Sequence, residues 1–64
     1  MGVYRTWANR LWGGTQTWNK CPAIRKAGVK EIMRQDVAAE DPAYPERNAE
    51  RYEEIIGEPY VVEE

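Results

Sequence analysis

The chain has 64 residues, which is enough for one small domain over residues 1–64. A single cysteine excludes an intrachain disulfide, and the absence of histidine and serine removes the groups used by most zinc sites and nucleophile–base pairs. Residues 1–34 carry seven basic residues against one acid, a net charge of +6, whereas residues 35–64 carry two against ten, a net of −8. We therefore expect no enzyme, no cofactor and no metal, and a chain whose opposite charges direct association.

The size of the chain also predicts a partner. A domain this short buries only about 60% of the surface that its unfolded form exposes, so its core is marginal. Without a disulfide or metal, the remaining way to stabilise it is an oligomer interface or docking into a larger assembly. The N-terminus lacks the apolar run of a signal peptide, and no apolar stretch approaches the roughly 20 residues that span a bilayer. We expect neither secretion by a signal peptide nor membrane insertion.

The first predicted helix covers about residues 3–12. Its apolar side chains recur at helical spacing and form one face: Tyr4, Trp7, Ala8, Leu11 and Trp12. Gly13, followed by Gly14, is expected to take the left-handed position past the helix end. Residues 15–21 are predicted to form a loop that contains Trp18.

The second predicted helix covers about residues 22–39. Pro22 suits the first helical position, because its missing N–H would be unpaired there. The apolar stripe that follows is Val29, Ile32, Met33 and Val37. Gly28 costs about 1 kcal/mol relative to alanine inside a helix. It either ends a one-turn helix or lies within a single helix bent at this point, and we favour the single helix.

The third predicted helix covers about residues 45–56, from Pro45 to the residue before Gly57, and Pro59 prevents its continuation. Across a connector at residues 41–44 it should form an antiparallel hairpin with the second helix, capped by Trp7, Leu11 and Trp12 of the first. Residues 60–62 should form an extended tail that packs back or adds as a strand to a partner sheet. The predicted fold is all-α, with three short helices.

The acidic residues of the third helix are predicted to form a solvated face. Glu46 would lie in the first turn, where the helix dipole favours a negative charge. Glu50, Glu53 and Glu54 are interspersed with Arg47 and Arg51, which is typical of ion pairs along a helix surface. We therefore interpret these carboxylates as surface charges and not as general acids or metal ligands.

Three tryptophans are a heavy aromatic load for so short a chain. Trp7 lies in the middle of an apolar stripe, so we predict a role in the core in preference to a role at an interface. Trp18 fits either role. We expect at least one tryptophan to contact a partner, because aromatic residues and arginine are enriched at protein interfaces. The predicted interaction residues are Arg5, Arg10, Trp7, Trp12, Trp18, Tyr52, Ile55 and Tyr60.

Residues 52–60 resemble the C-terminal signature of the XkdX family of short proteins from phage tail modules. That signature is a Tyr-x-x-Ile-x-Gly-x-x-Tyr pattern, and Tyr52, Ile55, Gly57 and Tyr60 match it. The chain departs from the pattern at Ile56, where threonine is usual, and at Pro59, where an acid is common. The resemblance implies a small structural or accessory component of a bacteriophage tail or particle, located in the virion or the host cytoplasm.

Three functions remain open from the sequence. The first is a structural or accessory protein that acts by protein–protein interaction, in a larger assembly or as a homo-oligomer. The second is a small regulatory or inhibitory protein that binds a host enzyme through its acidic helix as a polyanion mimic. The third is weak nucleic-acid binding by the basic half, where basic residues alternate with aromatic ones. We favour the first, because the acidic half would compete with or repel a nucleic acid.

Overall fold

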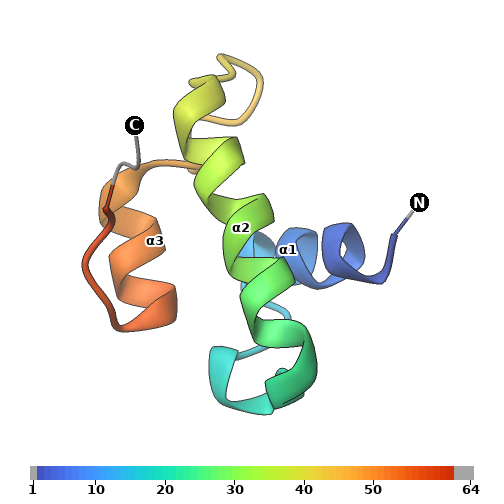
Figure 1. The fold of residues 1–64 in the computed structure, drawn as a ribbon. Coiled ribbons are helices and arrows are strands. Elements are labelled where there is room, and N and C mark those ends of the chain that lie inside the picture. The colour runs from blue at the N-terminus through green and yellow to red at the C-terminus, as the bar shows by residue number, and fades with distance from the viewer. Residues whose placement is uncertain (1, 62–64) are drawn as a thin grey trace.

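A computed structural model describes residues 2–61 of the chain. It contains three α-helices, α1 (Val3–Gly13), α2 (Ala23–Ala39) and α3 (Ala49–Ile56), and a 3₁₀ turn at Trp18–Lys20. Within this described range there is no strand, so the predicted all-α class is confirmed. Helices α2 and α3 run in opposite directions beside each other, and α1 crosses behind α2 (Figure 1). None of the helices is long and apolar enough to span a membrane.

The core lies between the three helices and is more extensive where α1 meets α2 than where α3 meets either. Its buried apolar members come from all three helices and from the loop before α2, and they are Ala8, Leu11, Trp12, Cys21, Val29, Met33, Tyr52 and Ile56. Trp7, Trp18, Ile32, Val37, Ile55 and Tyr60 are half-buried and pack against this cluster. The apolar stripes of all three predicted helices therefore face one another, as their spacing indicates.

Helix α2 is continuous through Gly28, as favoured from the sequence. The structure supplies a reason for a glycine at this position. The ring of Tyr4 in α1 packs directly over it, and a Cβ atom on Gly28 would lie 2.7 Å from two ring carbons. The missing side chain lets α1 approach α2 closely, which offsets the poor helix propensity of glycine.

Two helix ends differ from the prediction by one residue. Helix α2 begins at Ala23, with Pro22 as its extended N-cap residue. Helix α1 includes Gly13, and it is Gly14 that takes the left-handed conformation, with φ of 81°. The Gly14 N–H then donates to the carbonyls of Arg10 and Leu11, which ends the helix.

The predicted start of the third helix at Pro45 is wrong. Residues 44–48 form successive turns, in which the Arg47 N–H donates to the Tyr44 carbonyl at 3.0 Å. Helix α3 begins only at Ala49, because Asn48 caps it: the Asn48 side-chain oxygen accepts from the Arg51 N–H at 2.9 Å. Glu46 therefore lies outside the helix, and Glu50 is the acid of its first turn.

The tail after α3 turns back along the helix as far as the structure describes it, and the prediction that it packs back is met by Tyr60. Its ring meets the buried ring of Tyr52 edge to face, with centroids 5.3 Å apart. The Tyr60 N–H donates to a Glu53 carboxylate oxygen at 2.9 Å, and Glu58 pairs with Lys30 of α2 at 2.8 Å. Val62 lies outside the described residues.

Candidate functional site

A buried carboxylate joins α2 to α1 and to the connector that follows α2. Asp36 is only 7% exposed. Its two oxygens accept hydrogen bonds from the Arg5 guanidinium at 2.7 and 2.9 Å and from the Trp12 indole N–H at 3.0 Å. Arg47 of the connector lies 3.8 Å away on the other side. One side chain thus connects three segments that are distant in the sequence.

The charge of Asp36 is stabilised by these neighbours. Burial by itself would raise the pKa of the Asp36 carboxyl, but the hydrogen bonds from Arg5 and Trp12 and the charges of Arg5 and Arg47 hold it below its usual value. The same hydrogen bond raises the pKa of the Arg5 guanidinium. Asp36 is therefore ionised at neutral pH and compensates the positive charge gathered around it.

Arg47 holds the connector at residues 40–48 against the helices. Its guanidinium donates to the Asn9 side-chain oxygen at 3.1 Å and stacks on the ring of Tyr44, 3.8 Å from the ring centroid. Its Nε is buried without a hydrogen-bond acceptor in the described part of the chain. Arg51 makes a parallel connection, donating to the Trp12 carbonyl at 2.9 Å. Arg47 and Arg51 were predicted to pair with acids along the surface of the third helix; instead, both reach back to α1.

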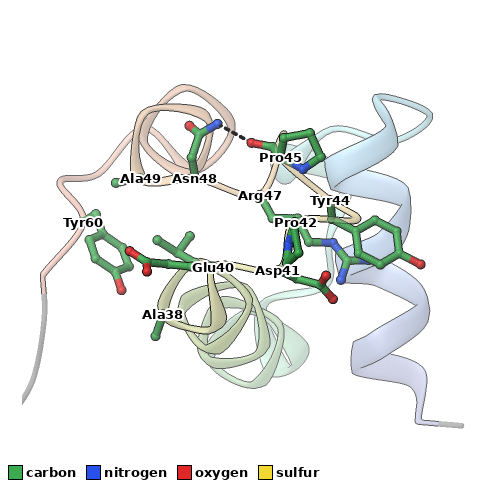
Figure 2. A pocket seen from close by; sticks show the side chains of 11 residues that line it. Ala38, Glu40, Asp41, Pro42, Tyr44, Pro45, Arg47, Asn48, Ala49 and Tyr60 are labelled. Atoms are coloured by element: carbon green, nitrogen blue, oxygen red, sulfur yellow. Dashed lines mark hydrogen bonds between the residues drawn. The ribbon is translucent and has the colours of Figure 1, made fainter.

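The held connector leaves a groove of about 690 Å³ between the end of α2, the start of α3 and the tail. Tyr60 lies at one end of it, and Tyr44 and Pro45 lie at the other (Figure 2). The rest of its lining comes from the last turn of α2, from the connector and from the first residue of α3: Val37, Ala38, Glu40, Asp41, Pro42, Arg47, Asn48 and Ala49. A groove of this size with aromatic and proline walls is typical of a surface that binds an apolar side chain.

Two carboxylates give the groove an acidic mouth. Glu40 and Asp41 are both exposed and follow directly after the last helical residue of α2. One oxygen of Asp41 accepts from the Ala43 N–H at 2.9 Å and shapes the turn. Glu40 has a left-handed backbone with φ of 49°, a conformation in which glycine or asparagine is usual at a helix end. This position therefore carries backbone strain together with an exposed negative charge.

The charges at the two ends of α2 are the reverse of those that its dipole favours. Arg25 and Lys26 lie in its first turn, which contains no acid, whereas Glu40 and Asp41 lie just beyond its last turn, which contains no base. Each such charge is unfavourable by about 0.3–1 kcal/mol at low ionic strength. The helix dipole therefore does not explain the placement of these four charges.

The predicted interaction residues are divided between the core and the surface. Trp12 and Tyr52 are core residues in this chain, while Trp7, Trp18 and Ile55 are half-buried against the core. Arg5 pairs with Asp36, and Arg10 is exposed in the last turn of α1. Only Tyr60 of the eight lines the groove. Their contacts with a partner stay a prediction.

Part of the basic half is already engaged inside the molecule. Arg5, Lys30 and Arg34 form ion pairs with Asp36, Glu58 and Glu31 respectively. Lys26 lies over the Trp18 ring, 5.2 Å from its centroid. These contacts reduce the positive charge available for a polyanion, and the acids that they use come largely from the acidic half of the sequence.

Sequence reasoning missed Asp36, Arg47 and the groove that they support. A signal for Asp36 existed: it follows Val29 by seven residues and Met33 by three, so it lies on the apolar face of α2. A lone acid on such a face indicates a buried ion pair. No comparable signal marked the groove, because its walls come from four separate segments of the chain.

Comparison with known proteins adds no relative. No family model matches the chain, and neither the curated proteins nor the solved structures contain a match. The candidate site therefore rests on its own geometry.

Proposed function

We propose that the chain is a non-catalytic protein-binding module, a small structural or accessory part of a larger assembly. The observation that carries this proposal is the groove of about 690 Å³, with Tyr44 and Tyr60 at its ends and Glu40 and Asp41 at its mouth. Its walls offer apolar and aromatic contact, and its exposed charged groups are the carboxylates of Glu40 and Asp41. Its occupant is a protein segment that presents an apolar side chain next to lysine or arginine.

The groove is positioned for binding by contacts that do not involve a ligand. Arg47 stacks on Tyr44 and bonds to Asn9, and Tyr60 packs on Tyr52. Both aromatic walls are thus held in place before a partner arrives, which lowers the entropy cost of binding. A groove prepared in this way supports recognition and needs no chemistry at its walls.

Within this class, a component of a bacteriophage tail or particle is the assembly that we favour. The support for it is the resemblance of residues 52–60 to the XkdX family of short proteins from phage tail modules. In this chain the four matching residues close the end of α3: Tyr52 packs on Tyr60, Ile55 is half-buried, and Gly57 ends the helix. The segment thereby sets Tyr60 at the groove.

A selection of random twelve-residue peptides displayed on a surface and captured by the purified chain tests the proposal. Ala38→Tyr fills the groove from an exposed helix position, and Ala39→Tyr is the matched control because Ala39 is exposed but does not line the groove. We expect the enriched peptides to combine an apolar residue with lysine or arginine and to bind the wild type and Ala39→Tyr equally well. Their affinity for Ala38→Tyr should be at least tenfold lower. Peptides that bind Ala38→Tyr as well as the wild type would contradict the proposal.

The polyanion-mimic alternative uses a different surface, the exposed carboxylates Glu50 and Glu54 of α3. Its support is weakened by Glu53 and Glu58, which already accept contacts from the Tyr60 N–H and from Lys30. Reversal of Glu50 and Glu54 to lysine separates the two functions. We expect this variant to retain the selected peptides; loss of binding in this variant alone would favour the acidic helix.

A further inference from the structure

Exposed apolar side chains of the described residues lie on α1 and near both ends of α2. Those that are large are Val3, Tyr4, Ile24, Tyr44 and Val61. Tyr44 lines the groove and Val61 follows Tyr60, so both lie beside the C-terminal end of α2. Ile24 lies in the first turn of α2 and is 84% exposed, the largest value among them.

The surroundings of Ile24 are basic, whereas the exposed charges of the groove are acidic. Lys20 precedes the helix and is exposed, and Arg25 is adjacent to Ile24 in the first turn. Ile24 is thus an exposed apolar side chain at the basic end of α2. That is the occupant chemistry that the acidic mouth at Glu40 and Asp41 favours. This inference therefore rests on the proposed function, because it uses the same groove.

Helical spacing places Ile24 and Ala38, one of the groove residues, on one face of α2. Ile24 and Ala38 are 14 residues apart, which is close to four helical turns, about 21 Å along the axis. Between them on this line lie Glu31 and Gln35, both exposed, while Gly28 at its edge is covered by the Tyr4 ring of α1. Two copies laid antiparallel along this face bring each Ile24 to the other's groove, and both contacts form at once.

We propose that a second copy of this chain occupies the groove, in an antiparallel twofold dimer in which each Ile24 enters the groove of the other copy. A twofold contact is self-complementary and closes at two copies. The arrangement also places Arg25 of one copy beside the carbonyl end of the other copy's α2, and Glu40 and Asp41 beside the other's N-terminal end. The charges that α2 carries against its own dipole then face the end of the partner helix that favours them.

The contact of a single helix face is small compared with the roughly 800 Å² that each partner buries in a standard interface. The dimer is therefore weak and forms at high protein concentration. Its charge contacts lie at the surface, so it dissociates further as the salt concentration rises. Both properties allow the same groove to exchange its occupant for another protein.

A pair of charge-reversed variants tests the dimer. The first variant, Lys20→Glu with Arg25→Glu, makes both ends of α2 acidic. The second, Glu40→Lys with Asp41→Asn, makes both ends basic and keeps the side-chain oxygen that accepts from the Ala43 N–H. The reversed charges suit the dipole of α2, so we expect both variants to fold at least as well as the wild type by circular dichroism. Sedimentation equilibrium at protein concentrations up to about 1 mM and low salt then gives their masses.

We expect the wild type to approach twice the mass of the chain, each variant alone to stay monomeric, and the equimolar mixture to dimerise again. Ile24→Ala should weaken the dimer about tenfold without loss of helix content, because an isoleucine side chain leaves its pocket. Glu40→Gly removes both a strained residue and a mouth charge, so it should give a more stable monomer and a weaker dimer.

The outcomes separate this inference from the proposed function. A mixture that remains monomeric while selected peptides still bind the groove overturns the dimer and leaves the groove as a binding site for other proteins. A mass that grows beyond two copies overturns the closed twofold arrangement. Loss of both peptide binding and dimer formation in folded protein overturns both proposals.

Discussion

Helices α1 and α3 both pack on α2, but they are held there by different forces. Helix α1 has 11 residues and buries Ala8, Leu11 and Trp12 against Val29 and Met33. Helix α3 has eight residues, buries Tyr52 and Ile56, and depends on a side-chain cap and on the tail that folds back over it. An isolated helix of eight residues is unstable in water. Apolar burial thus places α1 on α2, whereas polar contacts complete the placement of α3.

The arginines follow the same division. Arg5 lies on α1 and pairs with the buried carboxylate of Asp36. The apolar contact between α1 and α2 does not depend on this ion pair. Arg47 and Arg51 come from the connector and α3, and they supply the long-range hydrogen bonds from that region to α1. The groove lies in the polar region, so its shape depends on hydrogen bonds more than on the main core.

The largest effect is expected in the apolar region, from Leu11→Ala. Leu11 is fully buried between the helices, so the loss of its side chain should cost about 3 kcal/mol of unfolding free energy. Urea denaturation followed by circular dichroism measures it. Ile55→Ala on the half-buried face of α3 is the control and should cost about 1 kcal/mol. Equal costs would mean that both helices depend on apolar burial to the same degree.

Asp36→Asn is expected to have the next largest effect. It leaves Arg5 and Arg47 facing a neutral group, and the cost should be about 2 kcal/mol at pH 7, at the low end for a buried pair because the Arg5 side chain is 33% exposed. Urea denaturation of both proteins at a series of pH values measures the difference. Asp41→Asn, at an exposed position, should change stability little.

The pH dependence of this difference has a definite sign. The folded-state pKa of Asp36 lies below its ordinary value, so its contribution to stability is fully present above the unfolded pKa of about 4. It is lost as the pH falls below that value towards the folded pKa. The free-energy gap between wild type and Asp36→Asn should therefore shrink below about pH 4. A gap that is constant down to pH 2 would show that Asp36 contributes by shape and not by charge.

A smaller effect is expected in the polar region, from Asn48→Ala. The substitution removes the cap of α3 and should cost about 1 kcal/mol. Because the cap is local, amide hydrogen exchange should accelerate in α3 and the tail more than in α1. Asn19→Ala, at an exposed position in the 3₁₀ turn, is the matched control. Equal acceleration in α1 and α3 would mean that the two regions open as one unit.

The smallest effect is expected from Gly28→Ala, where two terms oppose each other. Alanine should gain about 1 kcal/mol of helix propensity, but its Cβ displaces the Tyr4 ring from its position over Gly28. We expect a net change of a few tenths of a kcal/mol in the wild type and a gain of about 1 kcal/mol in a Tyr4→Ala background. The double-mutant cycle measures the contact directly. The same gain in both backgrounds would show that Tyr4 does not require the glycine.

Much of the fold was predictable because it depends on local patterns. Apolar spacing identified the three helices, and the choice of one continuous helix through Gly28 was confirmed. The start of α3 was not found, because Pro45 is a favourable first residue and Asn48 is a favourable cap. In the structure Asn48 is the cap, because its side-chain oxygen accepts from the Arg51 N–H, and the preceding Arg47 is held outside the helix by Asn9 and Tyr44.

The candidate site was less predictable than the fold. Tyr60 was among the predicted interaction residues, and it lines the groove. The tryptophans, which the sequence marks most strongly, are core residues or pack against the core in this chain, because so small a fold needs large side chains to fill its interior. The exposure of Ile24 was not predicted, because a single apolar residue in a helix does not indicate on its own which side faces solvent.

The sequence by itself determined the helical class, the approximate extent of α1 and α2, and the division of charge between the two halves, since spacing and composition are properties of the chain alone. Only the tertiary structure decided that Asp36 is buried between Arg5 and Trp12, that Arg47 holds the connector open as a groove, and that Ile24 is exposed. These features arise from side chains far apart in the sequence; Arg47 and Asn9, for example, are 38 residues apart. No local pattern encodes such distances, because they depend on how the helices pack.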